Sequence, residues 1–173
     1  SESAEVTLDE DTLDRELLRT WLLRHAERVG ASLRRQGLAG RTVTLKIKYA
    51  DFRQITRQVT LDRRVCSTES IYEAACAILD RLELAGRVRL VGVGVSGFEA
   101  GAPEQLSLMP EKAAAGEEEK KRDKLNMAVD ALRSRYGTKA VVRGRLFEGG
   151  SGDHEAEAIQ AERAEAHRIR ERR

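Results

Sequence analysis

Residues 41–61 read RTVTLKIKYADFRQITRQVTL and contain two alternating segments on either side of a tight turn at Ala50 and Asp51. Residues two apart point to the same face of a strand, so this stretch predicts a β-hairpin with one apolar face. Arg57 interrupts the apolar parity, and we expect it where the second strand reaches an edge. The apolar positions are Val43, Leu45, Ile47, Tyr49, Ile55, Val59 and Leu61.

The opposite face of this hairpin carries small polar and basic side chains and no large apolar one. Hydroxyl, amide and ammonium groups contact phosphates without needing a pocket, so this face suits a phosphate backbone. Its residues are Thr42, Thr44, Lys46, Lys48, Gln54, Thr56, Gln58 and Thr60.

Two amphipathic helices are predicted on either side of the hairpin, because apolar residues recur there at helical spacing. Strands are predicted at residues 4–7 and 87–98, and the latter alternates Val with Gly and Ser. The order strand-helix-strand-strand-helix-strand predicts an α+β fold, with a four-stranded sheet, two helices on one face and the other face open. The expected helix caps are Asp11 or Thr12 and Ser67 or Thr68, and the expected stops are Gly37 and Gly86.

The composition changes after the last predicted strand, where both prolines and a charge run occur. Such a change marks a linker, and a further helix is expected after it, with Leu125, Val129, Leu132 and Tyr136 in register. A short strand is expected at 139–143, and the chain begins as a cut piece of a longer chain would. The expected parts are a domain at 1–100, a linker at 101–117, a helix with a short strand at 118–148, and a charged helical or disordered tail at 149–173.

Charge is unevenly distributed along the chain. Residues 13–98 carry 16 Lys and Arg against 9 Asp and Glu, whereas residues 1–12 carry five acids and no base. A basic domain is expected to bind a polyanion. No apolar run approaches the length of a membrane span, so no membrane partner is expected. Cys66 and Cys76 are expected to be reduced, and the three histidines have no metal-ligand spacing, so we expect no metal site and no catalytic residue.

Three segments together resemble a known family: RTVTLKIKYADFRQITRQVTL, STESIYEAACAILDRL and VRLVGVGVSGFE. They are similar to the little finger of the Y-family DNA polymerases, and within these to DNA polymerase IV. The resemblance implies a sequence-nonspecific DNA-binding accessory domain of a translesion polymerase, located in the bacterial cytoplasm and associated with the nucleoid. The family's palm, fingers and thumb would precede residue 1. The chain alone would therefore lack catalysis and cofactor, whereas the parent polymerase would use Mg²⁺.

The resemblance also implies the partners: duplex or primer-template DNA, a sliding clamp, and the catalytic core of the same polymerase. Leu90 and Gly94 stand where some relatives carry an Arg, so the last strand is less basic here than in those relatives. By position, the implied DNA contacts are Thr44, Lys46, Lys48, Thr56, Arg57, Gln58, Arg87, Arg89, Gly92, Gly94 and Ser96.

A second, shorter resemblance lies beyond the domain. The stretch QLSLM is similar to the peptide by which such polymerases bind the sliding clamp, with Met109 in place of the usual Phe. A flexible thioether fills an apolar pocket of similar shape, and Pro103 and Pro110 bracket the segment. The implied clamp contacts are Gln105, Leu106, Ser107, Leu108 and Met109.

Three other function classes stay open at this point. An RNA-binding module of the same strand order would carry paired aromatics on its central strands, where this sequence has Thr, Lys and Gln. A small-ligand-binding α+β domain would need convergent polar groups in an apolar cleft, and the sequence pattern indicates no such cluster. A protein-interaction module without a DNA role is favoured by the charged tail alone.

Overall fold

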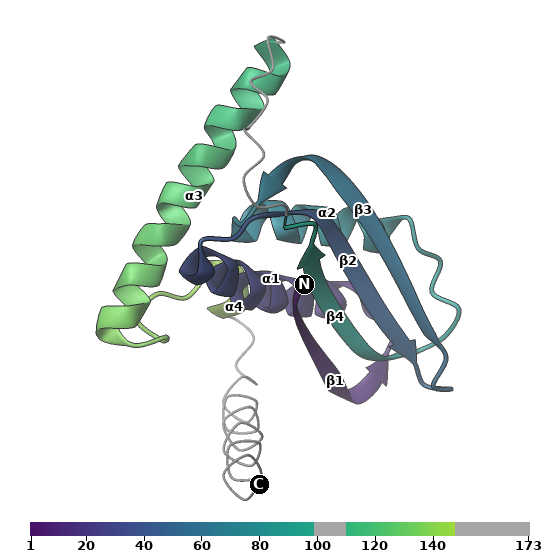
Figure 1. Cartoon of the computed structure of the whole chain (residues 1–173). Coiled ribbons are helices and arrows are strands. Elements are labelled where there is room, and N and C mark those ends of the chain that lie inside the picture. The colour runs from purple at the N-terminus through teal and green to yellow at the C-terminus, as the bar shows by residue number, and fades with distance from the viewer. Residues whose placement is uncertain (99–109, 148–173) are drawn as a thin grey trace, which may run out of the picture. The chain divides into compact units, whose positions relative to one another are not determined.

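The computed structural model describes residues 1–98 and 110–147 (Figure 1). By contacts the chain divides into two units, Ser1–Val141 and Val142–Arg173. None of the described helices is long and apolar enough to cross a membrane. The elements in chain order are β1 (Glu2–Thr12), α1 (Arg15–Gln36), β2 (Gly40–Tyr49), β3 (Gln54–Val65), α2 (Thr68–Asp80), β4 (Val88–Ser96), α3 (Pro110–Tyr136) and α4 (Gly144–Phe147).

The four strands form one antiparallel sheet in the order β1-β4-β2-β3, which confirms the predicted α+β fold. β3 is an edge strand, as the broken parity at Arg57 indicates. α1 and α2 pack on one face of the sheet and enclose the core with it (Figure 1). The largest fully buried side chains include Leu18, Leu22, Leu33, Ile71 and Leu79 from the helices and Val43, Leu45, Ile47, Val91 and Val93 from the sheet.

The N-terminal strand is longer than predicted and moves the start of α1. β1 runs to Thr12, so neither Asp11 nor Thr12 caps the helix. Asp14 does so instead, and its carboxylate accepts from the backbone N–H groups of Glu16 and Leu17 at 2.8 and 3.2 Å. The helix ends as predicted at Gly37, whose φ of 64° suits glycine.

The second helix has the predicted cap but a different end. Ser67 caps α2, and the helix stops at Asp80 rather than at Gly86. The Arg15 guanidinium donates to the carbonyl oxygens of Leu79 and Leu82 at 2.9 and 2.7 Å. The Arg15 side chain of α1 thus donates to two carbonyl groups near the end of α2, where a longer helix would have used backbone N–H groups. Residues 82–87 form a loop.

Placing β1 in the sheet also changes the charge of the domain. The five acids of β1 lower its excess of positive charge from seven to two. Two of these acids bond to cations of the sheet, because β1 lies directly beside β4. The charge that matters for a polyanion is therefore local to one surface rather than a property of the whole domain.

The region after the sheet also differs from its prediction. α3 already begins at Pro110, so residues 110–117 of the expected linker are helical. Proline is tolerated in the first helical turn, and the Ala, Glu and Lys residues that follow favour a helix. α3 ends before Gly137, as expected. The strand expected at 139–143 is wrong, since these residues form turns and bends before α4.

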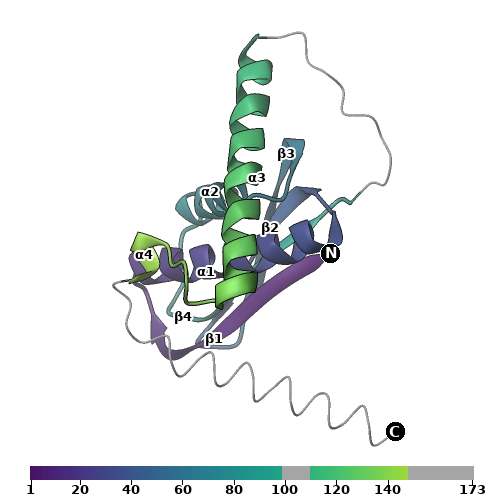
Figure 2. The same cartoon turned by 90° about the vertical axis from the view of Figure 1, so that its left-hand side faces the viewer.

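α3 lies beside the helices α1 and α2 (Figure 2). The side chains of α3 that contact them form a polar stripe. Arg34 on α1 binds Asp130 of α3 with two bonds, of 2.6 and 3.1 Å, and its guanidinium also donates to the Cys66 carbonyl oxygen at 2.7 Å. Arg133 of α3 binds Glu27 of α1 at 3.1 Å. Arg34 and Arg133 are largely buried, and each forms an ion pair with a carboxylate.

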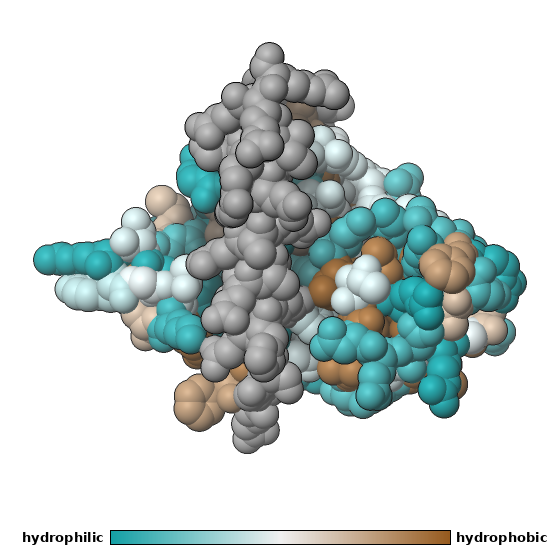
Figure 3. All heavy atoms as spheres, turned by 90° about the horizontal axis from the view of Figure 1, so that it is seen from below, coloured by the Kyte–Doolittle hydropathy of each residue, from teal (hydrophilic) through white to brown (hydrophobic). Residues whose placement is uncertain are grey.

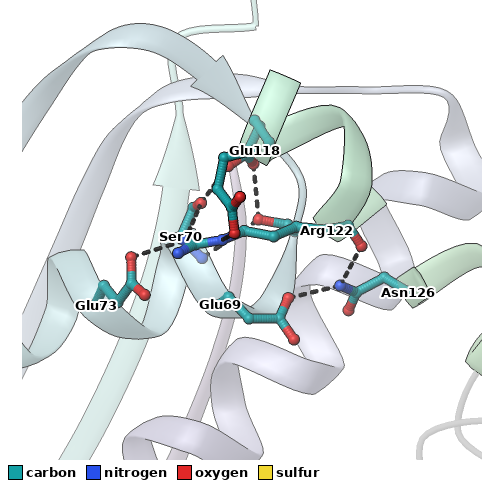
Figure 4. Close-up of polar contacts among 8 residues, drawn as sticks. Glu69, Ser70, Glu73, Glu118, Arg122 and Asn126 are labelled. Carbon is teal, nitrogen blue, oxygen red and sulfur yellow. Dashed lines mark hydrogen bonds and ion pairs between the residues drawn. The ribbon is translucent and has the colours of Figure 1, made fainter. Parts of the chain in front are cut away.

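The same stripe meets the first two turns of α2 (Figure 4). Arg122 of α3 donates to Glu73 at 2.8 Å, and the Asn126 amide donates to Glu69 at 2.6 Å. Glu119 accepts from the hydroxyls of Ser67 and Ser70 at the start of α2. By contrast, three of the apolar residues that the sequence places in register, Leu125, Leu132 and Tyr136, are exposed.

Candidate nucleic-acid interface

The sheet face opposite α1 and α2 carries polar side chains in regular rows. Directly paired residues of antiparallel strands share a face, so the register identifies which side chains are neighbours. Three rows cross the sheet from β1 to β3, a fourth runs from β4 to β3, and none contains an aromatic side chain. The rows are Thr7-Leu90-Lys48-Gln54, Glu5-Gly92-Lys46-Thr56 and Ser3-Gly94-Thr44-Gln58, with Ser96-Thr42-Thr60 at the far end.

We call this surface the outward face. It combines hydroxyl, amide and ammonium groups, and no element in the described part of the chain packs over it. In the space-filling view from below Figure 1, the coloured surface is mostly hydrophilic, with small apolar patches instead of one broad apolar area (Figure 3). Eight of the residues implied as DNA contacts lie on this face: Thr44, Lys46, Lys48, Thr56, Gln58, Gly92, Gly94 and Ser96.

Glycine at the centre of the outward face allows an ion pair to cross β4. The Lys46 ammonium on β2 lies 2.8 Å from the Glu5 carboxylate on β1, on either side of Gly92. A Cβ on Gly92 would lie only 2.7 Å from the Cβ of Glu5, so no side chain fits there. The missing side chain at Gly92 therefore leaves space for the Lys46–Glu5 ion pair and also exposes the Gly92 backbone. The sequence alternation does not reveal this partner of Lys46.

A second cation of the sheet is held at the end of the outward face that lies near the β2–β3 turn. Arg89 sits at an irregularity in the pairing of β4 and binds Asp11 with two bonds, of 3.0 and 2.9 Å. The hydrogen bond from Arg89 lowers the pKa of Asp11 below its ordinary value, and the same bond raises the pKa of Arg89. The guanidinium also lies over the Phe52 ring, 4.7 Å from its centroid.

Arg57, which the resemblance implies as a DNA contact, does not lie on the outward face. Arg57 pairs with Leu45, between Ile55 and Val59, so its side chain leaves the sheet on the side that the helices cover. It stays exposed there because β3 is the edge strand. With Leu82 and other residues it lines a hollow of about 400 Å³ beside the sheet edge. Arg87, also implied as a contact, lies exposed in the loop just before β4.

Several outward-face residues were absent from the implied contacts. Gln54 and the Thr42–Thr60 pair, whose hydroxyls lie 3.4 Å apart, have the parity of that face in the sequence. Ser3 and Thr7 come from β1, where polar residues alternate with Ala4, Val6 and Leu8. This alternation in the sequence of β1 could have predicted that the polar face extends onto β1.

Of the other chemistry-bearing side chains in the described residues, His25 and Cys76 are buried and Cys66 is partly buried. His25 is buried with its Nε2 atom unpartnered, and burial lowers its pKa to about 4. Cys66 and Cys76 are free thiols, and burial raises the pKa of Cys66 to about 12. No cluster of three or more metal-ligating side chains occurs within residues 1–98 and 110–147. The expected clamp contacts, residues 105–109, lie outside the described residues.

Comparison with known proteins identifies relatives of this fold. The DNA polymerase IV of Alkaliphilus oremlandii is 38% identical over 152 residues, which cover 82% of this chain and 36% of that protein. The DNA polymerase IV of Alkalilimnicola ehrlichii is 46% identical over 106 residues, covering 61% of this chain and 30% of that protein. The chain thus spans about a third of the length of these relatives.

Solved structures are similar in fold. The post-insertion binary complex of Dbh DNA polymerase matches with a TM-score of 0.50 at 16% identity, over 56% of this chain and 28% of that one. The little finger domain of PolIV, in its complex with the β-clamp processivity factor, matches with a TM-score of 0.48 at 25% identity, over 61% and 96% of the two chains. Residues 1–108 match the impB/mucB/samB family C-terminal domain. The chain belongs to this family, and the whole four-stranded sheet with α1 and α2 lies within the matched residues.

Proposed function

We propose that the outward face binds the sugar-phosphate backbone of duplex or primer-template DNA without preference for base sequence. The observation that carries the proposal is the set of polar rows around Gly92 and Gly94, on a sheet face that no described element covers. Threonine hydroxyls, glutamine amides and lysine ammonium groups all donate to phosphate oxygens. Glycines between them let the backbone come close to a ligand.

The lack of base preference follows from the same geometry. Base edges in the major groove are read by a helix or a narrow ribbon that enters the groove, through Arg, Asn or Gln side chains. The two helices of this domain, α1 and α2, lie on the opposite side of the sheet. A broad sheet face with short side chains follows the outside of a duplex and makes contacts that all sequences offer equally.

In the whole polymerase, this domain would hold the primer-template while other domains catalyse nucleotide addition opposite damaged bases at the bacterial nucleoid. Those domains would hold the Mg²⁺ ions of the reaction, because phosphoryl transfer requires metals held by clustered carboxylates. The chain alone, given deoxynucleotides, Mg²⁺ and a primed template, is expected not to extend the primer. Extension by a preparation free of contaminating polymerase contradicts this assignment.

We further propose that residues 105–109 bind a sliding clamp. Leu106, Leu108 and Met109 provide three apolar groups within a short segment, and Gln105 provides a polar anchor. Burial of two or three such side chains stabilises a complex by about 4–8 kcal/mol before ordering costs, which is compatible with micromolar binding. A labelled peptide of residues 102–112 should bind the clamp, and its double variant Leu108→Ala, Met109→Ala should not. Equal binding by the two peptides, or none by either at roughly tens of micromolar, removes the clamp from the proposal.

The DNA-binding proposal is tested by measuring duplex affinity across a range of salt concentrations. If roughly four phosphates are neutralised, log affinity should fall with log salt at a slope of about −4, from about −0.9 per contact. Unrelated duplexes of equal length should bind with equal affinity. An affinity that does not depend on salt, or a strong preference for one duplex, contradicts the proposal and favours a protein-interaction or small-ligand module.

A further inference from the structure

The β2–β3 turn places an aromatic ring where the fold makes no use of it. Phe52 is 62% exposed and is absent from the buried core and from the residues packed against it. Its φ of 67° is the only positive φ of a non-glycine residue in the described ranges. A left-handed backbone is unfavourable for a residue with a Cβ, and Gly or Asn would adopt it more readily. The choice of Phe therefore costs stability without contributing core packing.

The turn that carries this ring is firmly held. The Phe52 N–H donates to the Tyr49 carbonyl oxygen and the Tyr49 N–H donates to the Arg53 carbonyl oxygen, both at 2.9 Å. The Ala50 N–H donates to the carbonyl oxygen of Arg87, the residue before β4, at 2.8 Å. These bonds tie the turn to β4 as well as to its own strands, so the ring has a fixed place relative to both.

The ring contacts two cations from neighbouring strands. The Lys48 ammonium of β2 lies 5.0 Å from the ring centroid, and the Arg89 guanidinium of β4 lies 4.7 Å from it. The negative potential of an aromatic face attracts cations at these distances. It also offsets the repulsion between two like charges brought close together. Arg89 is held on its other side by Asp11.

We propose that Phe52 is a positioning residue of the outward face, which holds Lys48 and Arg89 side by side in orientations ready to bind the phosphates of DNA. The inference rests on the proposed DNA-binding function. Long cationic side chains lose rotamer freedom when they bind, and holding them in place beforehand removes part of that cost. Phe52 would then act through the two cations rather than by contacting DNA itself. Lys48 and Arg89 lie over the ring, so less of the ring surface is free to stack on a base.

The test uses the full 173-residue chain and four variants. Asn tolerates a positive φ, so Phe52→Asn should fold with an equal or higher Tm while binding a duplex about five- to tenfold more weakly, the effect of losing one to two exposed cation–π contacts. Phe52→Tyr keeps an aromatic face and should retain wild-type affinity. A purely structural role would lower Tm and affinity together, or change neither.

The other two variants show whether the ring acts through the cations. In a Lys48→Ala, Arg89→Ala background, adding Phe52→Asn should weaken binding no further. If it weakens binding as much there as in the wild type, the ring contacts DNA directly and the positioning role is refuted. Wild-type affinity in Phe52→Asn refutes it as well. If the wild type shows no salt-dependent binding, it is the DNA-binding proposal that fails.

Discussion

The domain has two charged surfaces, and they use their charges in opposite ways. On the helical side, Arg34, Arg122 and Arg133 each meet a carboxylate across the interface with α3, and Arg34 is only 7% exposed. On the outward face, Lys46 and Arg89 are bound by acids of β1, while Lys48 lies over an exposed ring. Lys46 and Arg89 stay about one-third exposed.

The difference teaches that positive charge alone does not mark a DNA-binding surface. Cations that are buried and matched by carboxylates hold an element of the same chain in place, because breaking such a pair leaves an uncompensated charge. Cations that are exposed and bonded to replaceable carboxylates at a sheet margin remain available to phosphates. Arginines on α1 and lysines on β2 thus have different roles although both contribute to the same net charge.

The largest expected effect concerns the matched surface. Arg34→Ala removes the partner of Asp130 and leaves that carboxylate and the Cys66 carbonyl group without their donor. The free energy of unfolding should fall by about 2–4 kcal/mol, slightly below the usual cost for a fully buried pair because Asp130 is partly exposed. Urea denaturation measures the loss, and Lys124→Ala on the exposed side of α3 should change stability by less than about 0.5 kcal/mol. Equal effects of the two variants, or weaker DNA binding by Arg34→Ala, would remove the distinction between the surfaces.

A buried cation that is not bonded directly to a carboxylate should be worse tolerated than a matched one, and His25 tests this. Burial lowers the pKa of His25 to about 4, helped by Arg28 and opposed by the Val91 backbone and Glu5. Below about pH 6.5 the unfolded chain binds a proton that the folded chain does not, so stability falls as pH falls through this window. The loss between pH 7 and pH 4 should be roughly 3 kcal/mol greater in the wild type than in His25→Gln, at about 1.4 kcal/mol per pKa unit. Parallel losses in the two proteins argue against a neutral, desolvated histidine.

Substitutions on the outward face should change DNA binding and leave stability nearly unchanged. Lys46→Ala and Lys48→Ala should each weaken duplex binding about three- to tenfold and make the salt slope shallower by about 0.9. Arg57→Ala is the matched control, since its side chain lies on the helix-covered side of the same sheet. A loss of affinity in Arg57→Ala equal to that in Lys48→Ala would show that the register does not decide which cations bind DNA.

The smallest expected effect is a gain of affinity. Glu5 competes with phosphate for Lys46, so Glu5→Gln should tighten duplex binding about two- to fivefold, as expected for releasing an exposed ion pair. Asp11 competes for Arg89 in the same way, so lowering the pH through its depressed pKa should release that guanidinium. Affinity measured with Glu5→Gln at constant pH and salt separates the first effect from the second. Unchanged or weaker binding by Glu5→Gln means that this carboxylate does not restrain Lys46.

Much of this fold was predictable because the hydrophobic periods of the strands and helices are clear. Alternation from Val43 to Tyr49 defines β2 and its two faces, and Gly37 and Ser67 mark one helix end and one helix start as predicted. What failed were boundaries that depend on tertiary contacts. β1 is extended by pairing with β4, and α2 ends beside Leu79, whose carbonyl oxygen accepts from the Arg15 guanidinium.

The candidate site was predictable in its residue types and less so in its partners. Parity places Thr44 and Lys46 on one face, but only the register shows that Glu5 lies across Gly92 from Lys46 and that Arg57 is paired with Leu45. α3 shows a similar limit. Periodicity identifies the helix, whereas its polar side contacts the domain and Leu125 is exposed, since complementary groups on α1 and α2 decide which side binds.

The most direct test of the central claim maps where DNA contacts the chain. Backbone amide resonances of the full chain should be followed by NMR during titration with a short duplex at low salt. Binding by the outward face predicts the largest shifts along residues 42–48 of β2 and 92–96 of β4, with small shifts along α3 and the face of α1 that it contacts. Shifts concentrated on α1 and α3, with β2 and β4 unaffected, would contradict a DNA-binding role for the outward face.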